Sequence, residues 1–141
     1  MTTSLQKFAD NFCALNKSNL HRLPDLYASD ISFTDPLHHI SGIVALQAYF
    51  AQLYDNVDTI KFDIHAHDCV SDNEGYLRWT MHFNHPRLRG GKTISVKGCT
   101  HLKWRDKVYY HHDYFDAGAM LYENVPVLGA VIAWLKKRLA T

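Results

Sequence analysis

The 141-residue sequence lacks the features that mark secreted or membrane proteins. Its three cysteines, Cys13, Cys69 and Cys99, are odd in number and show no CxxC spacing, which favours free thiols over a disulfide framework. The N-terminus has no apolar core typical of a signal peptide, and the longest apolar run, Val125 to Leu135, is too short to span a bilayer. We therefore expect a cytoplasmic domain with no membrane partner.

An excess of charge of one sign is missing as well. The formal net charge is only +1, whereas nucleic-acid-binding proteins usually carry a clustered basic face. The ten histidines include His38-His39 and His65-x-His67, but the chain has no HExxH motif and no Cys/His spacing typical of zinc sites. We therefore expect no nucleic acid, no metal and no other cofactor. The length predicts a single domain over residues 1–141.

Apolar spacing predicts helices in the first part of the chain. Helical periodicity covers residues 4–15, with Ser4 as the N-cap, then a short piece over 20–27 and an amphipathic helix over 43–54. A short strand over 30–35 ends at Pro36, because proline cannot donate to a strand ladder. We expect a loop over residues 37–42.

Alternating apolar residues predict four longer strands in the second part, over residues 59–70, 76–85, 93–104 and 107–116. Their tight connections favour an antiparallel meander. After a short helical stretch over 117–124, a last helix begins at Pro126. Its apolar stripe consists of Val127, Leu128, Val131, Ile132 and Leu135. Helices covering a curved antiparallel sheet give an α+β fold, here with an extra C-terminal helix.

The strand at 107–116, Lys-Val-Tyr-Tyr-His-His-Asp-Tyr-Phe-Asp, concentrates titratable and aromatic side chains. Alternation places His111 and Asp113 on one face, next to Tyr109 and Phe115. A carboxylate beside an imidazole orients it for proton transfer, although a buried polar pair can also serve packing alone. If the register slips by one residue, His112 and Asp116 take the place of the first pair.

Several segments together resemble the nuclear transport factor 2-like superfamily, which includes ketosteroid isomerases, SnoaL-like polyketide cyclases and scytalone dehydratase. They are the run from Leu26 to Pro36, Gly42 before the helix at Ile43, and the closing strand from Val108. The resemblance extends to Asp116, and the remaining tail resembles that of a bacterial branch to which no specific activity attaches. It implies a cone-shaped, curved antiparallel sheet wrapped on N-terminal helices, of the cystatin-like α+β barrel type. It also implies a homodimer through the outer sheet face.

The resemblance assigns roles to individual residues. Asp35 matches the proton-shuttling base of the ketosteroid isomerases, although its side chain could instead cap the turn before Pro36. His111 and Asp113 are similar to the acid/base pair of the SnoaL-like cyclases. The donor positions of the isomerases fall at Asn11 and Thr100, which are weaker donors, so steroid isomerisation is not expected.

We therefore predict a SnoaL-like protein that binds a small apolar or carbonyl-containing ligand. As an enzyme, it would be a cofactor-independent isomerase, cyclase or dehydratase acting by proton abstraction. The predicted catalytic residues are Asp35, His111 and Asp113, and the predicted ligand-binding residues are Asn11, Trp79, Thr100 and Phe115. The alternatives are a non-catalytic ligand-sensing or protein-interaction module on the same fold, and a peripheral membrane adaptor that uses the last helix.

Overall fold

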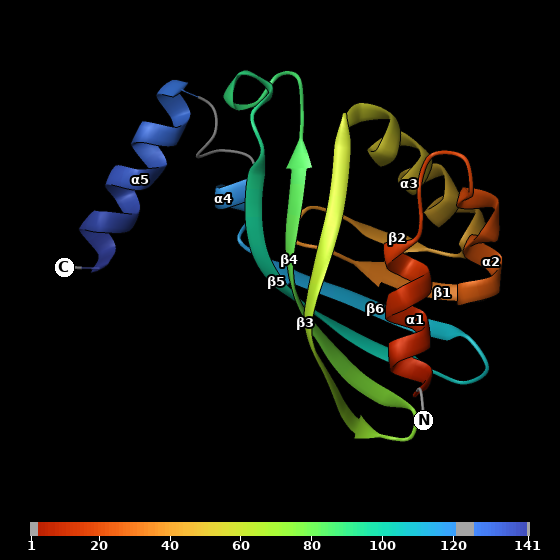
Figure 1. Ribbon diagram of the computed structural model, residues 1–141. Helices are drawn as coiled ribbons and strands as arrows, with labels where there is room; N and C mark the ends of the chain where they lie inside the picture. Colours follow the sequence, from red (N-terminus) through yellow and green to blue (C-terminus); the bar gives the residue numbers. More distant parts are fainter. Residues whose placement is uncertain (1–2, 121–125, 141) are drawn as a thin grey trace.

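A six-stranded curved sheet in the order β2-β1-β6-β5-β4-β3 organises the computed structural model, which describes the backbone of residues 3–120 and 126–140 and the side chains of 3–118 and 130–140 (Figure 1). The strands are β1 (Tyr27–Thr34), β2 (His39–Ser41), β3 (Thr59–Ser71), β4 (Glu74–Asn84), β5 (Ile94–Trp104) and β6 (Val108–Phe115). The helices are α1 (Ser4–Cys13), α2 (Leu23–Leu26), α3 (Ile43–Asn56), α4 (Ala117–Met120) and α5 (Pro126–Ala140), with 3-10 turns at Leu20–Arg22 and Arg89–Gly91. Helices α1, α2 and α3 lie on the concave side of the sheet, which confirms the predicted α+β class.

The N-terminal helix is capped one residue earlier than predicted. Thr3, and not Ser4, is the N-cap: its hydroxyl accepts a hydrogen bond from the backbone N–H of Gln6, and the Gln6 side chain accepts one from the N–H of Thr3. This capping box satisfies two backbone donors that the first turn leaves open. The buried residues Leu5 and Phe8 of α1 then face the sheet.

Strands β3 to β6 form the predicted antiparallel meander. Its register brings Trp79 of β4 opposite Gly98 of β5. A Cβ at position 98 would collide with the six-membered ring of Trp79, so glycine allows this ring to lie directly on the backbone of β5. The meander thereby fixes the position of a large aromatic side chain on the concave face.

The segment predicted as a loop over residues 37–42 contains a strand, which corrects the sequence prediction. Strand β2 pairs with β1 in antiparallel register, and β1 pairs in parallel with β6, so that Phe33 lies beside His111. A three-residue strand is too short to show alternation in the sequence, and a parallel neighbour 70 or more residues away leaves no local signal. Gly42 precedes α3 with φ of 89°, a conformation that suits glycine.

The last helix, α5, stands on the opposite side of the sheet from α1 and α3 (Figure 1). Lys136 of α5 forms an ion pair with Asp116. The side chains of Val127 and Leu128 and residues 121–124 of the predicted helical stretch lie outside the described residues, but Val131 and Leu135 of the predicted stripe are exposed. Within the described ranges, no helix is both long and apolar enough to cross a membrane.

Candidate functional site

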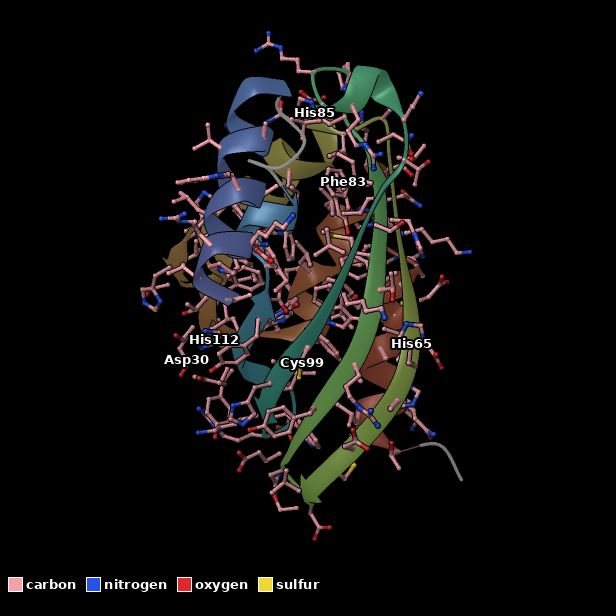
Figure 2. All side chains as sticks on the ribbon, turned by 90° about the vertical axis from the view of Figure 1, so that its left-hand side faces the viewer. Asp30, His65, Phe83, His85, Cys99 and His112 are labelled. Carbon is pink, nitrogen blue, oxygen red and sulfur yellow. The ribbon has the colours of Figure 1, made fainter. Side chains whose placement is uncertain are left out.

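A pocket of about 380 Å³ lies between the concave face of the sheet and helices α1 and α3. Most of its wall is apolar, and six of its aromatic side chains are Phe12, Phe33, Phe50, Phe62, Trp79 and Phe115. Phe83 and His85, which also line it, lie at the end of β4 near the Arg89–Gly91 turn (Figure 2). Its volume is within the usual range for small-molecule sites.

Asp113 reaches this pocket from β6 and is held by two donors. Nε2 of His111 lies 2.8 Å from Oδ1 of Asp113, and the Thr100 hydroxyl donates to the same oxygen at 2.6 Å. Thr100 in turn accepts a hydrogen bond from the indole N–H of Trp79 at 2.8 Å. Among the described residues, none donates to Oδ2 of Asp113. One oxygen therefore anchors the carboxylate, and the other remains open to accept a proton or a donor.

His111 lies behind Asp113, only 2% exposed, and its Nδ1 lies 2.8 Å from the hydroxyl of Tyr27. Burial, followed by the negative charge of Asp113, raises the pKa of Tyr27 well above its usual value, so this hydroxyl keeps its proton. In the described part of the chain, Nδ1 of His111 is the one hydrogen-bond partner of that hydroxyl. The buried proton therefore points to Nδ1, and Nε2 carries the hydrogen that His111 donates to Asp113.

Asp35 also lines the pocket, but both of its oxygens are engaged. Oδ1 accepts from the backbone N–H groups of Leu37 at 2.8 Å and His38 at 2.7 Å, and Nδ1 of His38 lies 3.3 Å from it. Oδ2 accepts from the Tyr49 hydroxyl at 2.6 Å. Burial and then this hydrogen bond raise the pKa of Tyr49, so the phenol remains a donor. Asp35 thus caps the turn around Pro36, the alternative that the sequence left open.

The predicted site residues fall into three groups. Trp79 and Phe115 line the pocket together with the two aspartates. His111 and Thr100 are buried and contact Asp113, without lining the pocket themselves. Asn11 is exposed on α1 and is not among the lining residues, so the structure does not bring this predicted donor to the site.

Of the two residue pairs that the sequence offered for the pocket face of β6, the structure places His111 and Asp113 on that side. His112 lies on the other face of β6, where its ring stacks on Tyr114 with centroids 4.1 Å apart (Figure 2). Asp116 follows the end of β6 and pairs with Lys136. β6 is irregular between Val108 and Tyr110, but from Tyr110 to Phe115 its residues pair one by one with β5, so His111 and Asp113 share a face and His112 lies on the other.

Two tyrosines of the site, Tyr27 and Tyr49, were not among the predicted site residues. Tyr27 follows Leu26 at the start of β1, Tyr49 precedes the buried Phe50 in α3, and a tyrosine hydroxyl that enters a core usually needs a partner. That signal could have marked them as polar members of the core. It could not have shown which acidic or basic residue each one contacts, because these partners lie on other elements.

The described residues contain no group of three or more His, Cys, Asp or Glu side chains placed to hold a metal ion. Several histidines instead form separate pairs, such as His82 with Asp63 at 2.9 Å and His101 with Glu74 at 2.6 Å. In these pairs each histidine contacts one carboxylate directly, so these two histidines have partners other than a metal ion.

Comparisons with solved structures place the fold. A protein from Shewanella putrefaciens CN-32, suggested to be a SnoaL-like polyketide cyclase, is 20% identical over 85% of this chain and 95% of its own, with a TM-score of 0.71. A ketosteroid isomerase-like protein from Catenulispora acidiphila DSM 44928, solved with trimethylamine, is 15% identical over 87% of this chain and 94% of its own, with a TM-score of 0.74. An NTF2-like protein of unknown function from Exiguobacterium sp. 255-15 is 18% identical over 82% and 99%, with a TM-score of 0.66.

No curated protein matches this sequence. A family model, however, that of the SnoaL-like domain, matches residues 5–112, which is more than half of the chain. The structural neighbours share the fold of this chain. The chain therefore belongs to the SnoaL-like domain family, within the nuclear transport factor 2-like superfamily.

Proposed function

We propose that the chain binds a small, largely apolar, carbonyl-containing molecule in the pocket and that Asp113 accepts a proton from it. The observation that carries this proposal is the open Oδ2 of Asp113, which belongs to a carboxylate that lines an apolar pocket and is anchored through its other oxygen. A general base needs a free lone pair within reach of the substrate, and Asp113 has one.

The reaction would be a cofactor-independent isomerisation, cyclisation or dehydration. A C–H bond next to the carbonyl breaks, its proton moves to Oδ2 of Asp113, and the electron pair moves onto the carbonyl oxygen as an enolate. In an isomerisation the proton then returns to another carbon atom, and in a dehydration it goes to the leaving hydroxyl, which departs as water. In a cyclisation the enolate carbon forms a C–C bond to a second carbonyl carbon of the ligand, and the oxygen of that carbonyl takes the proton. His111 does not touch the ligand; it is a positioning residue that keeps its Nε2–H on Oδ1 of Asp113.

Asp35 has a different role in this scheme. Its oxygens accept hydrogen bonds from Tyr49, His38 and the backbone, so it shapes the pocket wall and its charge more than it exchanges protons. The neighbour solved with trimethylamine gives a further reason to expect a small ligand in a pocket of this fold.

Proton abstraction can be tested by hydrogen exchange in D2O, followed by proton NMR for a panel of small ketones and β-diketones. We expect catalysed loss of the signal of the hydrogen next to the carbonyl, and loss of this catalysis in Asp113→Asn. The matched control is Asp68→Asn, which removes an exposed carboxylate outside the pocket. Exchange at the wild-type rate in folded Asp113→Asn would contradict the base assignment.

A non-catalytic ligand-sensing or protein-interaction module is the second candidate, favoured by the position of the predicted donors. Thr100 gives its hydrogen to Asp113, and Asn11 is exposed, so neither is placed to stabilise an enolate oxygen. In that case the pocket would bind ligands with no exchange above the buffer rate. Binding without exchange across the whole panel would favour this candidate.

The homodimer remains a prediction. Tyr114, 51% exposed on the face of β6 away from the pocket, and Cys99 beside it on β5 belong to the outer face that a second copy would cover (Figure 2). Covering an exposed aromatic surface stabilises association. Sedimentation velocity at micromolar concentration should show a dimer, and a monomer would contradict this expectation.

A further inference from the structure

We propose that the ligand of this pocket carries a positive charge, as in a small alkylammonium group attached to an apolar body. This inference rests on the proposed small-molecule binding and narrows it to one substrate class. It follows from the side chains that line the pocket, because they combine negative charge with aromatic rings.

Charges of one sign predominate in the lining. Asp35 and Asp113 both contribute carboxylates, whereas no lysine or arginine lines the pocket among the residues that the structure describes. The two lining histidines are His38, whose side chain is 48% exposed and lies against Asp35, and His85, just beyond the end of β4. A buried carboxylate whose surroundings lack a fixed cation attracts a cation from the ligand.

The hydrogen bonds of His111 leave one oxygen of Asp113 to the ligand. Among the described residues the Tyr27 hydroxyl has its one acceptor at Nδ1 of His111, so Nε2 carries the hydrogen that the ring donates to Oδ1 of Asp113. Oδ2 of Asp113 is therefore the oxygen that a cationic group of the ligand would contact.

Aromatic rings connect the neighbourhoods of the two carboxylates. Ring contacts, with centroids 5.3 to 6.2 Å apart, run without a break through Tyr49, Phe33, Phe50, Phe12, Phe62, Trp79 and Phe115. Tyr49 donates to Asp35 at one end, and Trp79 reaches Asp113 through Thr100 at the other. Aromatic faces carry partial negative charge and bind quaternary ammonium groups, so the wall adds to the attraction of the carboxylates.

The same arrangement disfavours anions. A carboxylate or phosphate on the ligand would lie near two like charges, and its transfer from water would be offset by no lysine or arginine in the described lining. If the substrate is attached to a phosphate-bearing carrier, we therefore expect the carrier to remain outside the pocket.

Matched probes that differ in charge test the proposal. We suggest choline, its neutral carbon isostere 3,3-dimethyl-1-butanol, and the anion 3,3-dimethylbutyrate, with binding followed by the NMR signal of the Trp79 indole N–H. Choline should bind roughly tenfold more tightly than the alcohol, as a desolvated cation–π contact predicts, and the anion should bind most weakly. Equal or tighter binding of either the alcohol or the anion would overturn the proposal while leaving small-molecule binding intact. Failure of all three probes would contradict both.

Variants identify the source of the preference. Asp113→Asn and Asp35→Asn should each lower choline affinity while changing the affinity of the alcohol by less than about twofold, because only the charged probe depends strongly on the carboxylate. Asp68→Asn is the matched control, since it changes the net charge equally from an exposed position. An equal loss of choline binding in the control would overturn the proposal. If a pocket variant does not fold, the wild-type preference between the isosteres still decides.

Discussion

Two aspartates line the same pocket, yet their surroundings differ. Asp35 follows β1, and its two oxygens together accept hydrogen bonds from the backbone, His38 and Tyr49. Asp113 comes from β6, and the hydrogen bonds that it accepts from described residues, those of His111 and Thr100, all go to Oδ1. Each carboxylate is associated with a tyrosine, but the half-buried Tyr49 contacts Asp35 directly, whereas the buried Tyr27 contacts His111, which in turn contacts Asp113.

This difference teaches that lining a pocket does not by itself make a carboxylate a base. A carboxylate whose lone pairs are occupied stabilises the turn and the tyrosine around it. A carboxylate with one anchored and one open oxygen has a defined position and free basicity. We therefore propose a structural role for Asp35 and a proton-transfer role for Asp113, and the following predictions test these two roles.

The largest expected effect is on proton exchange. Asp113→Asn should slow exchange of a responsive carbonyl compound by about two to four orders of magnitude, which is the usual contribution of a general base. Asp35→Asn should slow it by less than roughly tenfold, since it removes charge but not the accepting group. Exchange rates of both variants, with circular dichroism as a check of folding, measure the difference. The reverse order would exchange the two roles.

The second effect is on stability, where substitution of Asp35 should have the larger effect and substitution of Asp113 the smaller one. Asp35→Ala should lower the free energy of unfolding by about 2–4 kcal/mol, because it leaves two backbone N–H groups and the Tyr49 hydroxyl without their acceptor. Asp113→Ala removes the acceptor of two donors and should cost less. Urea unfolding curves of both variants, with Asp68→Ala as a surface control, provide the measurement. A larger loss in Asp113→Ala would show that Asp113 is the main structural carboxylate.

A smaller effect is expected for the relay behind Asp113. Tyr27→Phe should lower the free energy of unfolding by about 1–2 kcal/mol and release the preference of His111 for hydrogen on Nε2. Two-bond nitrogen–proton NMR spectra distinguish the histidine tautomers. Tyr109→Phe is a suitable control, because Tyr109 is half-buried and packs under Arg105. An unchanged tautomer in Tyr27→Phe would remove Tyr27 from the relay.

The smallest effect concerns alkaline pH. Burial raises the pKa of Tyr27 and Tyr49 above the ordinary value of about 10, and that of Tyr54 to about 12. A raised pKa in the folded state means that folding favours the protonated phenol. This contribution to stability is complete below pH 10 and declines as the pH rises above about 10 through the folded-state values.

Unfolding curves between pH 8 and about 11.5 can detect this decline as a loss of stability at the upper end. Tyr49→Phe should make the decline shallower, since ionised Tyr49 would place a negative charge against Asp35. A stability that rises with pH over this interval, or an unchanged slope in Tyr49→Phe, would contradict the assigned burial and pairing.

Local regularity explains which parts of the fold could be predicted. The long strands and α3 follow from apolar periodicity, and Gly42 marks the start of α3 because of its positive φ. The short strand β2 could not be predicted, since three residues give no periodic signal. The exposure of Val131 and Leu135 in α5 was also not predictable, because an apolar stripe shows what favours burial and not whether a partner surface lies opposite.

For the candidate site, the sequence by itself determined that His111 and Asp113 share a face of β6, because the side-chain period of a strand is a local property. It also determined that Asp35 lies at the end of a strand before proline. Only the tertiary structure decided which carboxylate keeps an open oxygen. The deciding partners lie far away in the chain: Tyr27 is 84 residues from His111, Tyr49 is 14 from Asp35, and Thr100 is 13 from Asp113. Hydrogen bonds over such separations depend on how the sheet curves and how its strands pair, and no local pattern records them.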